Sequence, residues 1–219
     1  MTIGAMERHW PLFDLRLRTE RLELRLPTDD DLCALAEVAI AGVHGDHEMP
    51  FCSPWTRQSP DEVRRTFPQH HWRNRAEWSP EEWRLELAVV HDGRPIGTQA
   101  IGATTFRTSR TVQSGSWLGQ AHQGHGFGTE MRAAVLTLAF DHLGAIRAES
   151  GFLDGNDSSA GVSRSIGYRP DGTRIHVIEG RRRVEQRLLL DADDWREQSR
   201  HPVTVEGLDA CKEMFLGRD

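Results

Sequence analysis

Several short stretches of the chain alternate apolar and charged positions, as strands with one buried face do. The first is residues 21–26 (RLELRL), which predicts a half-buried strand. The stretch DDDLCALAEVAI follows, and Thr28 or Asp29 is placed to cap it as a helix whose positive end carries the carboxylates. The chain is therefore expected to place a helix directly after its first strand.

Residues 41–60 show no periodicity and are rich in glycine, proline and aromatic residues. We interpret them as a loop, and a loop of this length is more often functional than accidental. The stretch ends at Ser59 and Pro60, a capping residue and a tolerated first helical residue. These two residues predict that another helix follows the loop.

Predicted strands dominate the middle of the chain. Residues 84–90 and 95–106 flank an Asp-Gly pair, which between apolar runs predicts a hairpin. Residues 112–119 are a shorter strand candidate, in which Gly115 indicates a bulge or a close backbone approach. Later strands are expected at residues 146–152, 174–179 and 184–190.

Two further helices are predicted among these strands. Apolar positions recur at helical spacing from Met131 to His142, and Gly144 is placed to end that helix. Residues 156–166 form a shorter helix that ends at Gly167. Since the chain has no repeat and no glycine/serine linker, these elements predict one domain of the α+β (mixed α/β) class. The tail from residue 200 is ambiguous.

Composition narrows the classes of protein that the chain can represent. A formal charge of −6 argues against nucleic-acid binding, which needs a surplus of lysine and arginine. Three widely spaced cysteines without a CxxC pair are typical of reduced thiols in a cytoplasm. No signal-like apolar run and no stretch near the roughly 18 apolar residues of a membrane span is present. We expect a cytoplasmic protein that binds neither nucleic acid nor membrane.

The segment QGHGFG, residues 123–128, contains three glycines directly before a predicted helix. Glycines let backbone N–H groups approach an anion closely, and a helix start adds positive partial charge, so the segment resembles a phosphate cradle. It matches neither the GxGxxG dinucleotide fingerprint nor a P-loop. A tight strand-to-helix turn with no ligand is the alternative interpretation.

Two motifs in order resemble one family. Residues 123–128 are similar to the Q/R-x-x-G-x-G/A segment of the GNAT (GCN5-related N-acetyltransferase) superfamily, and the run from Asn156 to Tyr168 is similar to N-x-x-S-x-x-V-x-x-R-x-G-[FY]. The second pattern, with the opening RTERLELR, resembles the branch of ribosomal-protein serine and alanine N-acetyltransferases. The stretch GSWLGQAHQGHGFGTEMRAAVL further resembles actinobacterial members that accept succinyl-coenzyme A.

The resemblance implies a single GNAT-type domain with a splayed mixed sheet flanked by helices. It covers residues 18–195, which leaves an N-terminal extension at 1–17 and a C-terminal extension at 196–219. Many relatives self-associate, so we expect a homodimer or higher homo-oligomer. Trp195, Leu208 and Phe215 are candidates to cover a partner's surface.

The resemblance also implies a binding site for acetyl- or succinyl-coenzyme A as co-substrate, with no permanently bound cofactor. The pyrophosphate is expected on the backbone amides of the glycine segment, and the pantetheine arm near the last helix. A backbone amide of the fourth strand of the family's fold is expected to meet the thioester oxygen. The implied residues are Gln123, Gly124, His125, Gly126, Phe127, Gly128, Thr129, Asn156, Ser159, Trp117, Leu118 and Gly119.

Catalytic residues are less complete in this sequence. The family often places a tyrosine acid at the position of Ser163 and a glutamate base at the position of Gly151. Ser163 becomes the candidate acid for the leaving thiol, and Tyr168 is interpreted as a packing residue. Glu149 lies on the same strand face as Gly151 and is a candidate base, with a water-mediated route as the alternative.

The acceptor is a primary amine: a protein N-terminus, a lysine or a small molecule. An α-amine is about a tenth neutral at pH 7 and lysine below roughly one in a thousand, so a weak base favours the α-amine. Arg57 in the long loop is a candidate partner of a succinyl carboxylate. His44, Asp46 and His47 could ligate a metal, but no further ligand is indicated, so we predict no metal. The alternatives are an antibiotic or polyamine acetyltransferase and a non-catalytic acyl-coenzyme A sensor.

Overall fold

The computed structural model describes residues 5–197 and 201–217, and within them the strands form one mixed sheet of nine. The spatial order is β7-β8-β6-β5-β4-β3-β2-β1-β9, and every neighbouring pair is antiparallel except β5 with β6. The strands are β1 (Arg16–Arg18), β2 (Glu23–Arg25), β3 (Glu82–His91), β4 (Arg94–Thr104), β5 (Thr111–Leu118), β6 (Arg147–Leu153), β7 (Arg169–Ile178), β8 (Arg181–Asp191) and β9 (Thr204–Glu206).

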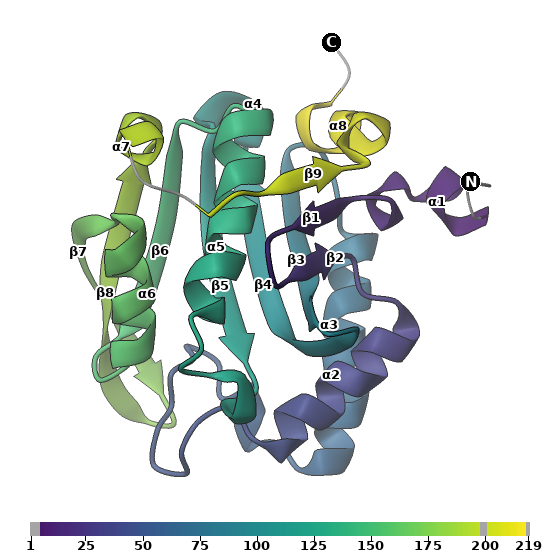
Figure 1. The fold of residues 1–219 in the computed structure, drawn as a ribbon. Helices are drawn as coiled ribbons and strands as arrows, with labels where there is room; N and C mark the ends of the chain where they lie inside the picture. The colour runs from purple at the N-terminus through teal and green to yellow at the C-terminus, as the bar shows by residue number, and fades with distance from the viewer. Residues whose placement is uncertain (1–4, 198–200, 218–219) are drawn as a thin grey trace.

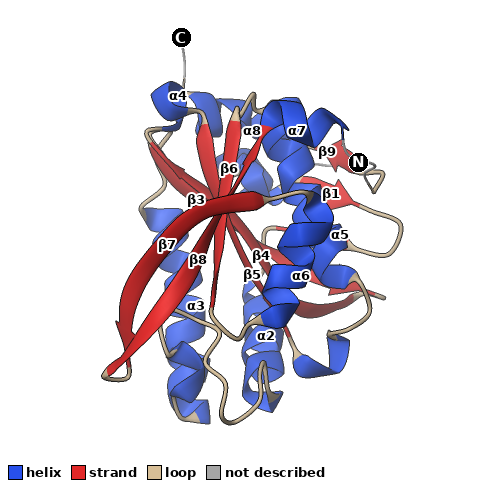
Figure 2. Ribbon diagram, turned by 90° about the vertical axis from the view of Figure 1, so that its left-hand side faces the viewer, coloured by secondary structure: helices blue, strands red, loops and turns tan. Residues whose placement is uncertain are grey.

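Helices cover both faces of this sheet. They are α1 (Ala5–His9), α2 (Asp29–Ala41), α3 (Pro60–Ala76), α4 (Phe106–Ser109), α5 (Phe127–Thr137), α6 (Asp157–Ile166), α7 (Ala192–Glu197) and α8 (Leu208–Leu216). Figure 1 looks onto the face covered by α5 and α6, with α3 behind the sheet. Figure 2 shows the twisted sheet between its helical layers.

Capping explains where α2 and α3 begin. Thr28 accepts a hydrogen bond from the Asp31 amide while Asp31 binds the Thr28 backbone, and Ser59 and Glu62 repeat this reciprocal arrangement at α3. The sequence predicted both starts correctly. The two helices bury Leu32, Leu35 and Phe67 against one face of the sheet.

The larger core lies on the opposite face. α5 is buried almost all round and packs between the sheet and α6, with Ala134, Val135 and Leu136 fully buried. Its last turn widens into a π-helical turn, η4 (Leu138–His142), before Gly144 adopts a positive φ of 72°. The predicted helix from Met131 to His142 is therefore confirmed.

The parallel pair separates soon after it forms. β5 and β6 are paired at only three positions, which end at Gln113 opposite Glu149. Beyond them β5 continues to Leu118 alongside β4, and β6 continues to Leu153 alongside β8. The sheet is thus splayed between β5 and β6, as the predicted fold class requires.

The structure changes some predicted boundaries. β4 ends at Thr104, and Phe106 begins α4 instead of ending the strand. The ambiguous tail forms β9 and α8, and β9 pairs with β1. β1 crosses the expected domain boundary at residue 18 and β9 lies beyond the one at residue 195, and both strands belong to the same sheet.

The expectation that Trp195, Leu208 and Phe215 cover a partner is wrong. All three side chains are buried in their own chain, with exposed fractions of 1%, 8% and 0%. Trp195 stacks on Phe140, and Phe215 packs edge-on against Trp83. Their apolar surface stabilises the C-terminal segment on the sheet. Within the described residues no helix combines the length and apolar character needed to cross a membrane.

Candidate active site

The glycine segment forms a turn at the start of α5, beside the end of β5. Gly124 and Gly126 have positive φ values of 79° and 82°, and Gly126 is the N-cap of α5. A Cβ on Gly124 would meet nothing within 4 Å, so the turn borders open space. In the described part of the chain no acceptor engages the backbone N–H groups of residues 124–129. Six amides at a helix start are thus free to bind an anion.

Side chains around the segment hold this turn in place. Arg21 donates from Nη1 to the His125 carbonyl (3.0 Å) and from Nε to buried Glu130 (2.8 Å). Burial alone would raise the pKa of Glu130, but hydrogen bonds from Thr19 and Arg21 outweigh it and lower the pKa. Glu130 therefore stays charged and ties the start of α5 to the β1–β2 turn.

Gln123 is placed for a supporting role. Its Nε2 donates to the carbonyls of Val43 (2.7 Å) and Leu118 (2.8 Å), so its side chain joins β5, the long loop and the glycine segment. The side chains of His125 and Phe127 pack with their ring centroids 5.9 Å apart. Phe127 is buried, whereas His125 is exposed beside the turn.

α6 lies close against α5 because Gly128 has no side chain. A Cβ there would lie 3.0 Å from Val162 Cγ2. Thr129 Oγ1 lies 3.1 Å from Ser165 Oγ across the same contact. Asn156 caps α6 by accepting from the Ser159 amide (3.1 Å), so these two predicted residues define where α6 begins.

Of the three amides predicted to meet a thioester, only that of Leu118 faces the splay. The Gly119 N–H donates to the Ile96 carbonyl (2.9 Å) and is not available. Because antiparallel bonding alternates along a strand, the Trp117 amide also faces β4, whereas the Leu118 amide faces the splay. The same alternation turns the amide of Ser116 toward the splay, which sequence reasoning missed, whereas the Ser114 amide faces β6 where the two strands still pair.

A buried arginine lies at the splay on the α5 face. Arg132 of α5 is 4% exposed, and its guanidinium donates to the hydroxyls of Ser116 on β5, Ser150 on β6 and Ser163 on α6, at 3.1 to 3.2 Å. No carboxylate pairs with it among the residues that the structure describes, and its Nε has no partner there. Burial lowers the pKa of this guanidinium. The cluster is therefore a cationic, serine-lined position suited to an anion.

Ser163 and Tyr168 both belong to this cluster. Ser163 is 1% exposed, and because its Oγ accepts from Arg132 Nη1, its own O–H is left to donate elsewhere. Tyr168 is buried with its hydroxyl 3.3 Å from Ser114 Oγ, and burial raises the pKa of the phenol. Tyr168 packs in the core, as its interpretation from the sequence requires.

Comparison with known proteins identifies the family that this arrangement represents. The acetyltransferase (GNAT) domain family matches residues 21–169, about two thirds of the chain. The chain belongs to the GNAT family. The match runs from the residue that anchors the glycine segment to the strand that follows α6.

Individual relatives of this GNAT domain are more distant. "Probable N-acetyltransferase YjcK" of Bacillus subtilis (strain 168) is 30% identical over 92 residues, 42% of this chain and 51% of that protein. The chain thus spans about half the length of this curated relative.

Two solved structures have the same fold. Mycobacterium smegmatis RimJ in complex with CoA-disulfide has a TM-score of 0.69 at 20% identity, over 93% of this chain and 94% of that one. RimL, a ribosomal α-N-protein acetyltransferase in complex with coenzyme A, has a TM-score of 0.64 at 15% identity, over 80% and 97%. At these identities the likeness shows the fold alone.

The opposite face of the GNAT sheet carries a groove of about 730 Å³. Gln113 and Glu149 line it at the last paired position of β5 and β6, and Gln113 Nε2 donates to Glu149 Oε2 (3.2 Å). Glu77 and Glu82 add two carboxylates to the groove, against one guanidinium from Arg84. The net charge of this lining suits a cationic amine.

The long loop packs over the same face, beyond the groove. Trp55 contacts Trp117 of β5 at a centroid distance of 5.6 Å. His44 is engaged at both ring nitrogens, by Gly45 O (2.8 Å) and Thr56 Oγ1 (2.7 Å). Arg57 donates to Glu48 O (3.0 Å) and lies 3.9 Å from Glu179, so its charge is already balanced at the tip of the β7–β8 hairpin.

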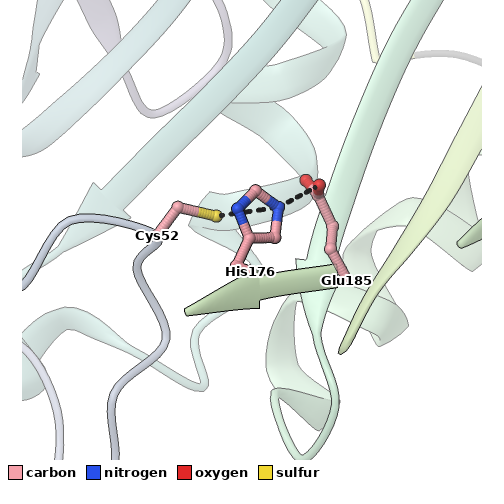
Figure 3. A group of neighbouring side chains, drawn as sticks. All are labelled: Cys52, His176 and Glu185. Carbon is pink, nitrogen blue, oxygen red and sulfur yellow. Dashed lines mark hydrogen bonds and ion pairs between the residues drawn. The ribbon is translucent and has the colours of Figure 1, made fainter. Parts of the chain in front are cut away.

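Sequence reasoning missed a cluster between this loop and the hairpin. His176 Nε2 of β7 lies 2.8 Å from Glu185 Oε2 of β8 and 3.8 Å from Cys52 Sγ (Figure 3). The ligand atoms of the three residues lie within 4.8 Å of one another, a spacing that a metal ion can also use. The same nitrogen of His176, Nε2, contacts both Cys52 and Glu185, so the three side chains form a hydrogen-bonded cluster. No sequence motif links positions 52, 176 and 185.

Proposed function

We propose that the chain is an N-acyltransferase that moves an acetyl or succinyl group from coenzyme A to a primary amine by direct attack in a ternary complex. The observation that carries the proposal is the row of free amides at residues 124–129, at the start of α5 and next to the open splay of β5 and β6. Membership of the GNAT family supports it. So does the coenzyme A bound in the similarly folded RimJ and RimL structures.

The glycine segment would hold the pyrophosphate, since six unpaired N–H groups and the helix dipole favour a multiply charged anion. The pantetheine arm would then run toward the splay, between β5 and α6. There the Leu118 amide faces the gap and would donate to the thioester oxygen. An amide fixed in advance at that position can be worth roughly 3 kcal/mol of the barrier.

Arg132 and Ser163 would serve the leaving group. When the amine nitrogen attacks the thioester carbon, the C–S bond breaks and its electron pair stays on sulfur. The free O–H of Ser163 would donate to that thiolate, while the buried charge of Arg132 stabilises it. Arg57 fits a succinyl carboxylate less well than the sequence suggested, because Glu179 and Glu48 already engage it.

The acceptor would approach from the α2/α3 face, where the groove presents more carboxylates than cations. The carboxylates of this face suit an amine, and an α-amine is neutral in a larger fraction at pH 7 than a lysine side chain because its pKa is lower. A protein N-terminus is therefore the acceptor class that we favour over lysine side chains, antibiotics and polyamines. A cytoplasmic homo-oligomer remains our proposal for the assembled protein.

Release of free thiol from acetyl- and succinyl-coenzyme A, measured across a panel of peptides, lysine derivatives, aminoglycosides and polyamines, tests the proposal. We expect thiol release that depends on amine and saturates with both substrates. Arg57→Ala is expected to leave the ratio of succinyl to acetyl transfer unchanged within about twofold. Tight coenzyme A binding without thiol release from any amine would instead identify a sensor.

A further inference from the structure

The cluster of Cys52, His176 and Glu185 lies on the α2/α3 face of the sheet, close to the splay. Side chains alternate along a strand, and the pairing of β6 with β8 places Glu185 opposite Leu153, on the same face as Gly151 and Glu149. His176 shares that face through the pairing of β7 with β8. Figure 3 shows the three side chains converging from the loop and the hairpin.

Glu185 occupies the space that a side chain at position 151 would need. An ideal Cβ on Gly151 would clash with Glu185 Oε1 and lie 3.0 Å from its Cδ. The carboxylate of β8 therefore reaches across the bare backbone of β6. Gly151 lies two residues past the last paired position of β5 and β6, where the gap between the strands is open.

Glu149, the base that the sequence suggested, is placed differently. It lies at the last position where β5 and β6 still pair, and Gln113 of β5 binds its carboxylate. An amine that attacks through the open part of the splay passes Gly151 rather than Glu149. On β5, Gly115 likewise lies two residues past the last paired position and has no side chain. A Cβ on Gly115 would have one neighbour within 4 Å, Arg84 Nη2 at 3.9 Å.

We propose that Glu185, supplied by β8 across Gly151, is the general base that takes the proton of the attacking amine, and that His176 positions its carboxylate. The inference rests on the proposed acyl transfer and names the base for it. The nitrogen–carbon bond forms, the carbon–sulfur bond breaks with its electron pair on sulfur, and one amine proton moves to Glu185. His176 fixes the carboxylate through the 2.8 Å contact to Oε2, which leaves Oε1 over Gly151.

Cys52 is a neighbour and not a nucleophile in this arrangement. Burial and the negative charge of Glu185 raise the pKa of its thiol, so it stays protonated. The titratable and charged groups that face Glu185 from the packed elements are Cys52 of the loop, Arg174 and His176 of β7, and Arg183 and Arg187 of β8.

Steady-state thiol release with the best amine, together with calorimetric binding of coenzyme A, tests this assignment in the full chain. Glu185→Gln is expected to lower kcat about 100-fold and leave coenzyme A affinity within about twofold, because a general base acts on the acceptor alone. At pH values below the amine pKa, the residual rate of Glu185→Gln is expected to rise tenfold for each unit by which the pH increases, because the neutral fraction of the amine does so. Glu206→Gln on β9, at the opposite edge of the sheet from β7, is the carboxylate control and is expected to match the wild type. Glu149→Gln changes the lining of the acceptor groove and is expected to lose less activity than Glu185→Gln.

A swap variant separates catalysis from a structural role. Glu185→Ala combined with Gly151→Glu returns a carboxylate to the same space from β6. We expect this double variant to be at least tenfold more active than Glu185→Ala alone. His176→Asn is expected to reduce kcat about tenfold with unchanged KM for the donor, since the carboxylate loses its fixed orientation. Cys52→Ala is expected to match the wild type.

Three results would overturn the assignment. They are full activity of Glu185→Gln, a loss in Glu149→Gln as large as the one expected of Glu185→Gln, and parallel losses in Cys52→Ala and with a chelator, which would make the cluster a metal centre. Failure of the acyl transfer itself looks different, because the wild type would then release no thiol with any amine.

Discussion

The two faces of the splay differ in how their groups are assembled. On the α5 face the candidate anion-binding amides belong to six consecutive residues, 124–129, at one helix start. On the α2/α3 face the candidate base comes from β8, its positioning residue from β7, and the space between them from a glycine of β6. The donor side is built locally and the acceptor side by the packing of distant segments. The donor side can thus be found as a motif, and the acceptor side only in the fold.

Replacing the buried cation of the α5 face is expected to have the largest effect. Arg132→Met should reduce kcat about 100- to 1000-fold, because the thiolate loses its only nearby buried positive charge among the described residues. The melting temperature should stay equal or rise, since an apolar side chain of similar size avoids an uncompensated buried charge.

Thiol release and thermal unfolding measured on the same preparation check both parts. Exposed Arg164→Met of α6 is the control and should leave kcat unchanged. An active Arg132→Met enzyme would show that the α5 face needs no charge.

Acid should disturb the α2/α3 face before the α5 face. Burial of His71 in α3 lowers its pKa to about 4 from 6.5, so the folded state keeps it neutral. Below pH 6.5 the unfolded chain takes up a proton that the folded chain refuses, and stability falls until about pH 4. The expected loss between pH 7 and pH 5 is about 2 kcal/mol.

Urea unfolding at the two pH values measures this loss. His71→Gln should remove most of it, and exposed His142→Gln should not. An unchanged pH dependence in His71→Gln would assign the acid sensitivity to other groups.

The sequence could predict the α5 face, which is built from local contacts, better than the α2/α3 face, which is assembled from distant segments. Residues 123–128 and Asn156 to Gly167 were recognisable because their contacts are local: two positive-φ glycines, an N-cap and a C-cap. Both capping boxes and the main hairpin were equally local.

Non-local contacts explain what the sequence left undetermined. Trp195 and Phe215 are buried by segments far along the chain, so their spacing alone could not distinguish an interface from the core. The approach of Glu185 to Gly151 depends on the register of β6 and β8. The sequence showed that position 151 lacks a glutamate, but it did not show that the carboxylate of Glu185 lies beside this position.

A smaller effect is expected from Ser163→Ala, which removes the hydroxyl that we propose as the proton donor to the leaving sulfur. We expect kcat to fall about tenfold with little change in coenzyme A affinity, because Arg132 still supplies the charge. Ser165→Ala, on the same helix but exposed, should be neutral. Single-turnover thiol release measures both, and equal rates for Ser163→Ala and the wild type would remove Ser163 from the mechanism.

The smallest effect is expected from Tyr168→Phe. Among the described residues its hydroxyl has one hydrogen-bond partner, Ser114 Oγ, so its loss should cost about 1 kcal/mol of stability and less than threefold in kcat. Chemical unfolding and thiol release measure these values. A drop above about 30-fold would make Tyr168, and not Ser163, the acid of the α5 face.

The most direct test of the account is a calorimetric titration of coenzyme A into the wild type, Gly126→Val and Gly144→Val. Both glycines have positive φ, 82° and 72°, so valine strains the two turns alike, but only Gly126 borders the free amides. The account predicts saturable 1:1 binding to the wild type, similar binding to Gly144→Val, and at least tenfold weaker binding to Gly126→Val. No binding to the wild type, or equal binding to all three proteins, would contradict it.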